Sequence, residues 1–202
     1  IIKAGSGVIY LVPEIALTHQ LTEEVRKRFG GGVAVLHSGL TPSQKLKEWQ
    51  RIKSGEAQFV IGARSAVFAP VQNLGLIIID EEHESAYKSS ARPRYHARQV
   101  AMHRAAGGCV RLIMGSATPS IEAWHQVSNG KIMGFKLGGR LSGGSMPSVE
   151  LIDMKKYSSC ISKPLETAVR EAAAEGRQSI LFLNRRGFSY FFHCRSCGYE
   201  SR

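Results

Sequence analysis

One apolar run in this chain ends on three consecutive carboxylates and a histidine. Leu74–Ile79 contains three isoleucines in a row, and Asp80, Glu81, Glu82 and His83 follow at once. A run without polar alternation is typical of a strand buried on both faces of a parallel sheet. The acids then lie at the carboxyl end of the strand, where open parallel sheets bind ligands. Such acids suit a hydrated Mg²⁺ and the activation of a water on a nucleotide phosphate. The simpler alternative is a strand followed by a solvated acidic turn.

Strands and helices alternate along the first part of the chain. Between the strands, Pro13 stands near the start of a helix that Gly30 ends, and Thr41–Gln44 has the form of a capping box. The second helix is expected to end at Gly55 and to turn its apolar residues Leu46, Trp49 and Ile52 inward. This alternation predicts an α/β fold with a doubly wound parallel sheet. The expected strands are residues 8–12, 33–36, 59–62, 74–79 and 110–114.

A glycine-rich stretch divides the chain. Residues 126–148 contain two Gly-Gly pairs and are typical of a connector. Beyond it, strands are expected at 149–153 and 179–183, with a helix from about Ser162 between them. The sequence therefore predicts a first lobe at 1–125, a connector at 126–148 and the start of a second α/β lobe at 149–202.

The charge balance favours a polyanionic partner. The chain has 27 Lys and Arg against 16 Asp and Glu, a formal net charge of +11, and nucleic acid is the usual partner of such a protein. Four unevenly spread cysteines do not form a disulfide framework. The sequence has no signal peptide and no apolar stretch of membrane-spanning length, so the cytoplasm is the expected location and a membrane is not an expected partner.

Two tyrosines and three basic residues follow the acidic box in residues 87–96, which we call the aromatic–basic segment. Aromatic rings stack on bases while Lys and Arg meet phosphates, a combination that suits single-stranded DNA. The alternative is a solvated loop with incidental tyrosines. The candidate DNA contacts in this segment are Tyr87, Lys88, Arg92, Arg94 and Tyr95.

Six short motifs occur in a fixed order: Leu11–Thr18, Leu36–Gly39, Gly62–Pro70, Asp80–His83, Gly115–Ser120 and Phe182–Gly187. Together they resemble the superfamily 2 helicases and, within them, the primosomal protein N′ family of bacterial replication-restart helicases. The resemblance implies a RecA-like first motor lobe and 3′→5′ helicase activity driven by ATP and Mg²⁺. It also implies a role in replication restart and primosome assembly, with single-stranded and forked DNA and other primosome and replication-restart proteins as partners.

The resemblance assigns roles to residues of the acidic box. It implies that Asp80 binds Mg²⁺, largely through water, and that Glu81 orients and deprotonates the attacking water. Glu82 and His83 belong to the same candidate catalytic set. His83 with the hydroxyls of Ser116 and Thr118 resembles the relay that links the nucleotide site to the DNA track. The alternatives are ordinary turn hydrogen bonds and, for Thr118 before Pro119, a helix N-cap, which is compatible with the relay.

Further positions match residues that touch the DNA backbone in such motors, where contacts hold register without reading sequence. A lone arginine at a strand end is also often only a surface charge. These candidates are Thr18, Arg64, Ser65, Arg185 and Arg186.

Two expected sites are incomplete in these 202 residues. No stretch has the glycine-rich phosphate loop with Lys and Ser or Thr: Val8 follows Gly5–Gly7, and Ile132 follows Lys131. The expectation is therefore that the chain begins inside the first lobe and ends inside the second. Cys194 and Cys197 form half of a zinc motif, and the family continues with further cysteines, so Zn²⁺ is expected in the full-length parent.

Three other functions fit part of the pattern. Another superfamily 2 DNA translocase, such as a restriction or repair motor, shares the acidic box. A non-catalytic DNA-binding module agrees with the missing phosphate loop. A metallohydrolase agrees less well, because Tyr87 stands four residues after His83, where a second histidine is needed.

Overall fold

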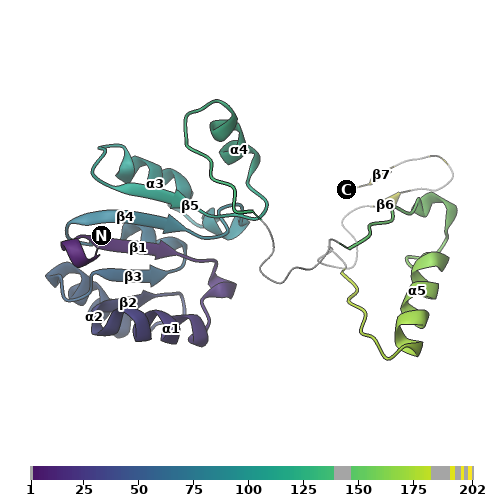
Figure 1. Cartoon of the computed structure of the whole chain (residues 1–202), viewed down its shortest axis with the longest axis horizontal. Coiled ribbons are helices and arrows are strands. Elements are labelled where there is room, and N and C mark those ends of the chain that lie inside the picture. Colours follow the sequence, from purple (N-terminus) through teal and green to yellow (C-terminus); the bar gives the residue numbers. More distant parts are fainter. Residues whose placement is uncertain (1, 139–146, 183–191, 194–196, 198–199, 202) are drawn as a thin grey trace. The chain divides into compact units, whose positions relative to one another are not determined.

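The computed structural model describes residues 2–138, 147–182, 192–193, 197 and 200–201, and the chain divides into two units, 1–137 and 138–202 (Figure 1). The division falls within the predicted connector. None of the described helices is both long and apolar enough to cross a membrane.

The first unit is built around a five-stranded sheet, and all its strands are parallel. The strand order is β2-β3-β1-β4-β5, and β1 pairs with β3 on one side and β4 on the other. This confirms the predicted fold class. The strands are β1 (Gly7–Leu11), β2 (Val33–Leu36), β3 (Phe59–Gly62), β4 (Leu74–Ile79) and β5 (Arg111–Met114).

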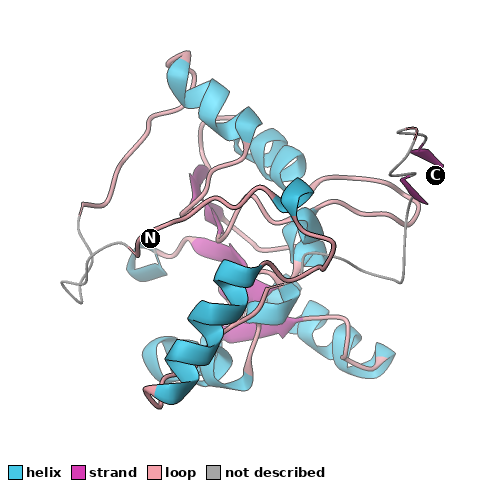
Figure 2. Cartoon of the chain, turned by 90° about the vertical axis from the view of Figure 1, so that its right-hand side faces the viewer, coloured by secondary structure: helices cyan, strands magenta, loops and turns pink. Residues whose placement is uncertain are grey.

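Helices cover both faces of this sheet, as a doubly wound fold requires (Figure 2). Val25 of α1 packs on one face, whereas Ile52 of α2 and Ala97 and Ala101 of α3 pack on the other. The helices of this unit are α1 (His19–Phe29), α2 (Pro42–Ser54), α3 (Ala97–Ala105) and α4 (Ile121–Ser128), with 3₁₀ turns η1 (Ile2–Ala4), η2 (Glu14–Ala16), η3 (Gly30–Gly32), η4 (Arg64–Phe68) and η5 (Ser85–Tyr87).

Local capping signals place the helix ends. The capping box at α2 is confirmed, because the Thr41 backbone N–H donates to Gln44 Oε1 (2.9 Å) and the Gln44 N–H donates to Thr41 Oγ1 (3.3 Å). The predicted start of the first helix at Pro13 is wrong: Pro13 precedes only η2, and Thr18 caps α1 by accepting from the Leu21 N–H.

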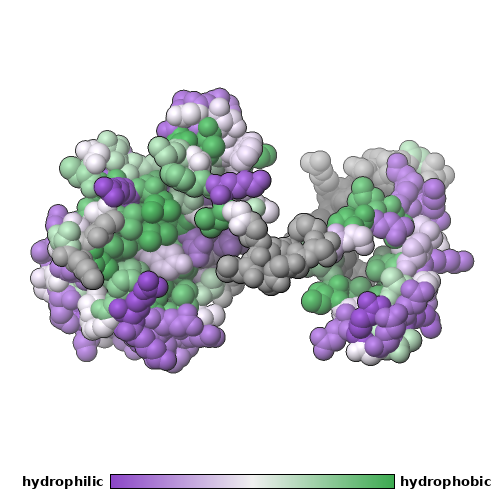
Figure 3. All heavy atoms as spheres, in the orientation of Figure 1, coloured by the Kyte–Doolittle hydropathy of each residue, from purple (hydrophilic) through white to green (hydrophobic). Residues whose placement is uncertain are grey.

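The two faces of the sheet differ in how far their cover extends. On what we call the α3 face, the row Val60, Ile9 and Ile77 is fully buried, and half-buried Leu112 continues it onto β5. On the opposite α1 face, Ile61 is fully buried, Tyr10 and Ile78 are half-buried, and Ile113 is 54% exposed. Green hydrophobic atoms reach the surface of this unit in Figure 3.

Two inward-facing residues predicted on α2 are not buried. Leu46 and Trp49 are exposed, and only Ile52 of this helix enters the core. The reason is geometric: a helix that meets the sheet along a narrow line buries the residue on that line and leaves its neighbours on the rim.

The second unit contains η6 (Met154–Lys156), α5 (Lys163–Ala174) and an antiparallel pair of β6 (Phe192–His193) and β7 (Glu200–Ser201). The predicted helix is confirmed, since the Ser162 hydroxyl caps α5 by accepting from the Leu165 N–H (3.3 Å). The predicted strands are wrong where they are described: residues 149–153 and 179–182 form no strand. No strand pairs with them in the described part of the chain, and a strand without a partner gains no ladder hydrogen bonds.

Candidate functional site

The carboxylate of Asp80 is held in one orientation at the end of β4. Its Oδ2 accepts a hydrogen bond from the Tyr10 hydroxyl of the neighbouring strand β1 (2.9 Å), and its Oδ1 accepts from the Glu81 N–H (3.1 Å). The backbone is held as well, since the Asp80 carbonyl accepts from the Tyr87 hydroxyl (2.6 Å). Each carboxylate oxygen keeps a lone pair for a further donor, so Asp80 presents a preoriented anionic acceptor at this edge.

Both phenols that hold Asp80 remain protonated donors at neutral pH. Burial raises the pKa of Tyr10 to about 12, and the hydrogen bond to Asp80 and the negative charge of that carboxylate act in the same direction. Burial also raises the pKa of Tyr87, again with the charge of Asp80 as the next cause. The sequence reasoning missed Tyr10; its signal is a polar-tipped ring in the middle of an apolar strand, which needs a partner for its hydroxyl.

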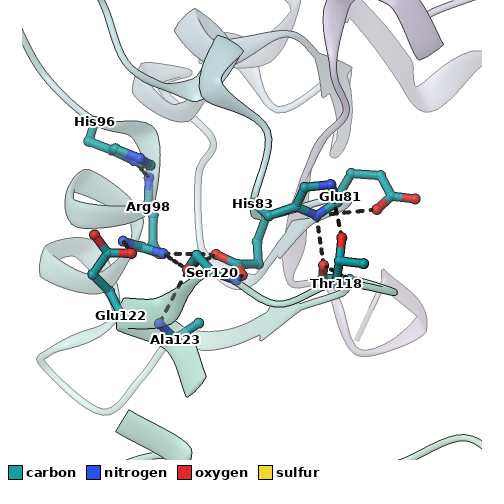
Figure 4. A network of polar contacts seen from close by, with 10 residues as sticks. Glu81, His83, His96, Arg98, Thr118, Ser120, Glu122 and Ala123 are labelled. Carbon is teal, nitrogen blue, oxygen red and sulfur yellow. Dashed lines mark hydrogen bonds and ion pairs between the residues drawn. The ribbon is translucent and has the colours of Figure 1, made fainter. Parts of the chain in front are cut away.

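The His83 ring faces Thr118 in the Gly115–Ser120 turn, and the Glu81 carboxylate lies beside that ring (Figure 4). The Nδ1 of His83 lies 2.7 Å from Ser116 Oγ and 3.6 Å from Glu81 Oε2, and its Nε2 lies 3.4 Å from Thr118 Oγ1. The structure thus brings together the residues of the predicted relay. Both ring nitrogens of His83 therefore have a polar partner.

Of the alternatives for Thr118, the helix cap is wrong, whereas a turn hydrogen bond is present. Ser116 Oγ accepts from the Thr118 N–H (3.0 Å), and Ser120 rather than Thr118 caps α4 by accepting from the Ala123 N–H (3.2 Å). The Thr118 hydroxyl therefore stays available to His83.

Glu82 does not belong with the exposed acids, which corrects its assignment to the catalytic set. It is 3% exposed, and Arg98 lies 2.8 Å from its Oε2. Ser120 donates to the same carboxylate through its N–H (2.7 Å to Oε1) and its hydroxyl (3.0 Å to Oε2). The left-handed backbone of Glu81 and the partners Arg98 and Ser120 accompany this inward direction of Glu82. Arg98 and Ser120 were missed by the sequence reasoning, and the signal for Arg98 is a cation next to the apolar residues of a short helix.

The aromatic–basic segment is closed at its base and exposed at its tip. The Ser89 N–H donates to the Tyr95 carbonyl (2.8 Å), and the backbones of Lys88 and His96 form an isolated antiparallel β-bridge. Lys88, Arg92 and Arg94 are exposed, as a DNA contact requires. Tyr95 is half-buried, with its ring edge-on to Phe68 and 5.8 Å from the Arg64 guanidinium carbon.

The predicted stacking role of Tyr87 is wrong in this conformation. Its side chain is 1% exposed in the core, and its hydroxyl is bound to the Asp80 carbonyl. The ring therefore has no face free for a base. An apolar ring with a single polar tip satisfies both needs inside the fold, and the sequence pattern alone does not separate this from a surface platform.

The other candidate DNA contacts lie in different settings. Arg64 turns toward the loop, where its Nη1 donates to the carbonyls of Ala86 (3.0 Å) and Lys88 (2.7 Å), whereas Ser65 and Thr18 are exposed. Arg185 and Arg186 lie outside the described residues.

The metal predictions rest on few described groups. Cys197 is a free, exposed thiol and Cys194 lies outside the described residues. Among the residues that are described, no group of three or more His, Cys, Asp or Glu side chains is placed to hold a metal ion. The oriented carboxylate of Asp80 fits a hydrated Mg²⁺, which binds proteins through one or two carboxylates and keeps several waters.

The chain is similar to known proteins over most of its length. The family model described as DEAD/DEAH box helicase matches residues 1–127. "Replication restart protein PriA" of Treponema pallidum is 55% identical over 98% of this chain and 30% of its own length, and that of Bacillus subtilis is 45% identical over 98% and 25%. Among solved structures, the C-terminal domain of the DEAD-box protein Dbp5 aligns with a TM-score of 0.40 at 14% identity, over 63% of this chain and 71% of that one.

The chain thus spans about a third or less of the length of these curated relatives. The family model covers more than half of the chain and includes β1 to β5, the acidic box and the turn that faces it. This chain belongs to the DEAD/DEAH box helicase family.

Proposed function

We propose that this chain is a section of an ATP-dependent replication-restart DNA helicase, which acts with 3′→5′ polarity on single-stranded and forked DNA and takes part in primosome assembly. The similarity to replication restart proteins over almost the whole chain supports this proposal. In the proposed protein, a phosphate-binding loop and further cysteines for a Zn²⁺ site come from sequence outside these 202 residues.

The observation that carries the proposal is the position of His83 between Glu81 and the hydroxyls of Ser116 and Thr118. Glu81 orients the attacking water and accepts its proton on the carboxylate, while Asp80, preoriented by Tyr10, would hold a hydrated Mg²⁺. When bound, that ion neutralises charge on the phosphates. His83 links the state of Glu81 to the turn that follows β5.

The DNA side of the proposal rests on the exposed cations of the aromatic–basic segment. Lys88, Arg92 and Arg94 are free to meet phosphates, and this contact is independent of sequence because it is electrostatic. Tyr95 is the remaining candidate for stacking on a base. A non-catalytic DNA-binding module stays a second candidate for the isolated chain, because its 202-residue sequence contains no stretch with the phosphate-loop pattern.

The test is DNA-stimulated ATP hydrolysis by a longer protein that carries this chain together with a phosphate loop. Glu81→Gln should lower kcat by about 10²–10⁴-fold and leave ATP binding unchanged, because only water activation is lost. Glu84→Gln is the matched control: it removes the same charge three positions along and should leave kcat within about twofold. An active Glu81→Gln variant, or hydrolysis by the isolated chain, would refute the assignment.

A further inference from the structure

Both carboxylate oxygens of Glu82 are already bonded within the fold. Oε1 accepts from the Ser120 N–H, and Oε2 accepts from the Ser120 hydroxyl and from Arg98 Nη1, all within 3.0 Å. The side chain is almost completely buried. To turn toward a nucleotide, this carboxylate would have to lose three hydrogen bonds, one from the Arg98 cation and two from neutral donors of Ser120. The contacts of Glu82 are therefore with the protein itself.

Three segments of the chain meet at this carboxylate, and Figure 4 shows two of its partners, Arg98 and Ser120, side by side. Glu82 belongs to the turn after β4, Arg98 to α3, and Ser120 caps α4. Arg98 also donates to the Ser120 hydroxyl and lies 3.7 Å from Glu122, which is 73% exposed. Since α3 begins where the aromatic–basic segment ends, the cluster also ties that segment to the acidic turn.

The residue before Glu82 is held in an unfavourable backbone conformation. Glu81 has φ of 45°, in the left-handed region that residues with a β-carbon rarely adopt. Such a conformation persists only where the surroundings over-determine it. On one side the Asp80 side chain accepts from the Glu81 N–H, and on the other the Glu82 N–H donates to the Gly115 carbonyl (2.9 Å). The side chain of Glu82, which is bonded to Ser120, anchors the same residue a second time to the segment that follows β5.

We propose that Glu82, Arg98 and Ser120 form a positioning clamp, which holds the turn after β4 so that Glu81 keeps its left-handed conformation and aims its carboxylate at the attacking water. This inference rests on the proposed hydrolytic function. Glu82 is then a positioning residue, and a buried ion pair is retained here for the conformation that it specifies, since such pairs contribute little to stability by themselves.

The kinetic test uses the longer protein with its phosphate loop. Glu82→Gln and Arg98→Gln should each lower kcat for DNA-stimulated hydrolysis by about tenfold or more, with KM for ATP within about twofold. The kcat of the double variant should be no lower than that of the less active single variant, because both substitutions break the same clamp. Glu122→Gln is the matched control, since it removes a carboxylate that faces the same Arg98 from the surface, and it should leave kcat unchanged.

The outcomes separate positioning from other roles. A merely structural role would lower the number of ATP-binding sites per chain and leave kcat per site unchanged. A direct role of Glu82 on the metal would raise the Mg²⁺ concentration needed for half-maximal rate and would make the losses of the double variant additive. Either result, or wild-type kcat in both single variants, overturns the clamp.

A second measurement does not depend on hydrolysis. In the 202-residue chain, amide hydrogen exchange at Glu82 and Glu84 should be about tenfold faster in Glu82→Gln than in the wild type and unchanged in Glu122→Gln, because these amides close the turn on Gly115 and Glu81. Unchanged exchange in Glu82→Gln refutes the clamp even if hydrolysis is found. Conversely, a wild-type protein without DNA-stimulated hydrolysis refutes the proposed function, while exchange still decides on the clamp.

Discussion

The two faces of the sheet end differently toward β5. On the α3 face, the buried row of Val60, Ile9 and Ile77 runs under α2 and α3 and extends to Leu112. On the α1 face, Ile61 is fully buried, Tyr10 and Ile78 are half-buried, and Ile113 is more than half exposed. Asp80 stands at the junction of the two, with Tyr10 reaching it from the α1 face and Tyr87 from the core of the α3 face.

This difference shows that one strand sequence can serve two environments. Ile77 and Ile78 are identical neighbours, yet only Ile77 is fully buried. The half-exposed α1 face lies beside the residues that we propose to act on ATP, whereas the α3 face contains the packing that fixes their backbone. Paired substitutions on the two faces therefore test whether the α3 face supplies the packing while the α1 face stays open to solvent.

The largest difference is expected between Ile77→Ala and Ile78→Ala. Truncation at Ile77 leaves a cavity in a fully covered core and should lower the free energy of unfolding by about 2–5 kcal/mol. Truncation at Ile78 removes hydrocarbon that is only partly buried, so a loss of about 1 kcal/mol is expected. Urea unfolding of the chain, followed by circular dichroism, measures both. Equal losses would contradict the comparison, since they would mean that the α1 face is covered in solution.

A smaller difference is expected between the two tyrosines that hold Asp80. Tyr87→Phe removes the hydroxyl that donates to the Asp80 carbonyl and should cost about 1–2 kcal/mol. Tyr10→Phe frees a carboxylate oxygen that water can reach, so its cost should be about 0.5 kcal/mol or less. Thermal unfolding of the two variants, which differ from the wild type by one oxygen each, gives the values. A larger loss in Tyr10→Phe than in Tyr87→Phe would mean that the Asp80 carboxylate is more deeply buried than the structure shows.

The sequence was sufficient for the sheet, because each buried strand carries its own apolar run and each run has a neighbour to pair with. It was not sufficient for residues 149–153 and 179–182, whose short apolar stretches have no partner strand in the described part of the chain. The helix α5 formed as predicted because a cap and a helical period act locally. Strands depend on partners that a local pattern does not reveal.

The sequence predicted where the candidate site lies, but not which of its side chains point inward. The position of the acidic box at the end of β4 followed from the apolar run before it. Which acid turns inward depends on the backbone angle at Glu81 and on Arg98, sixteen residues after Glu82. The same limit explains Tyr87, since residue type alone does not separate a buried ring with a bonded hydroxyl from an exposed one.

Acid should loosen the edge of the α3 face at the start of α3. His96 caps this helix by accepting the Arg98 N–H on Nδ1 (3.2 Å), which requires a neutral ring. Burial, and next the charge of Arg98, lower the pKa of His96 below its ordinary value. The cap therefore contributes fully above about pH 6.5 and is lost as the pH falls through the lowered pKa, at a cost of about 1 kcal/mol.

The control for this pH effect is His96→Asn, because asparagine caps a helix without titrating in this range. Its unfolding free energy should lack the part of the decrease below pH 6.5 that the wild type owes to His96. Urea unfolding at intervals between pH 8 and pH 5 compares the two. Parallel curves would assign the acid sensitivity to other groups.

The smallest effect is expected at β5, where the two faces differ most. Ile113→Thr keeps a β-branched side chain and its preference for a strand, and removes hydrocarbon that already meets water, so the unfolding free energy should change by no more than about 0.5 kcal/mol. Leu112→Thr, one residue away on the α3 face, places a hydroxyl among the apolar residues packed under α3 and should cost about 1–3 kcal/mol. Urea unfolding at two protein concentrations separates folding from self-association. If Ile113→Thr lowers the unfolding free energy by an amount that depends on protein concentration, a second copy of the chain covers the α1 face. If the loss is independent of concentration and equals that of Leu112→Thr, the chain covers this face itself.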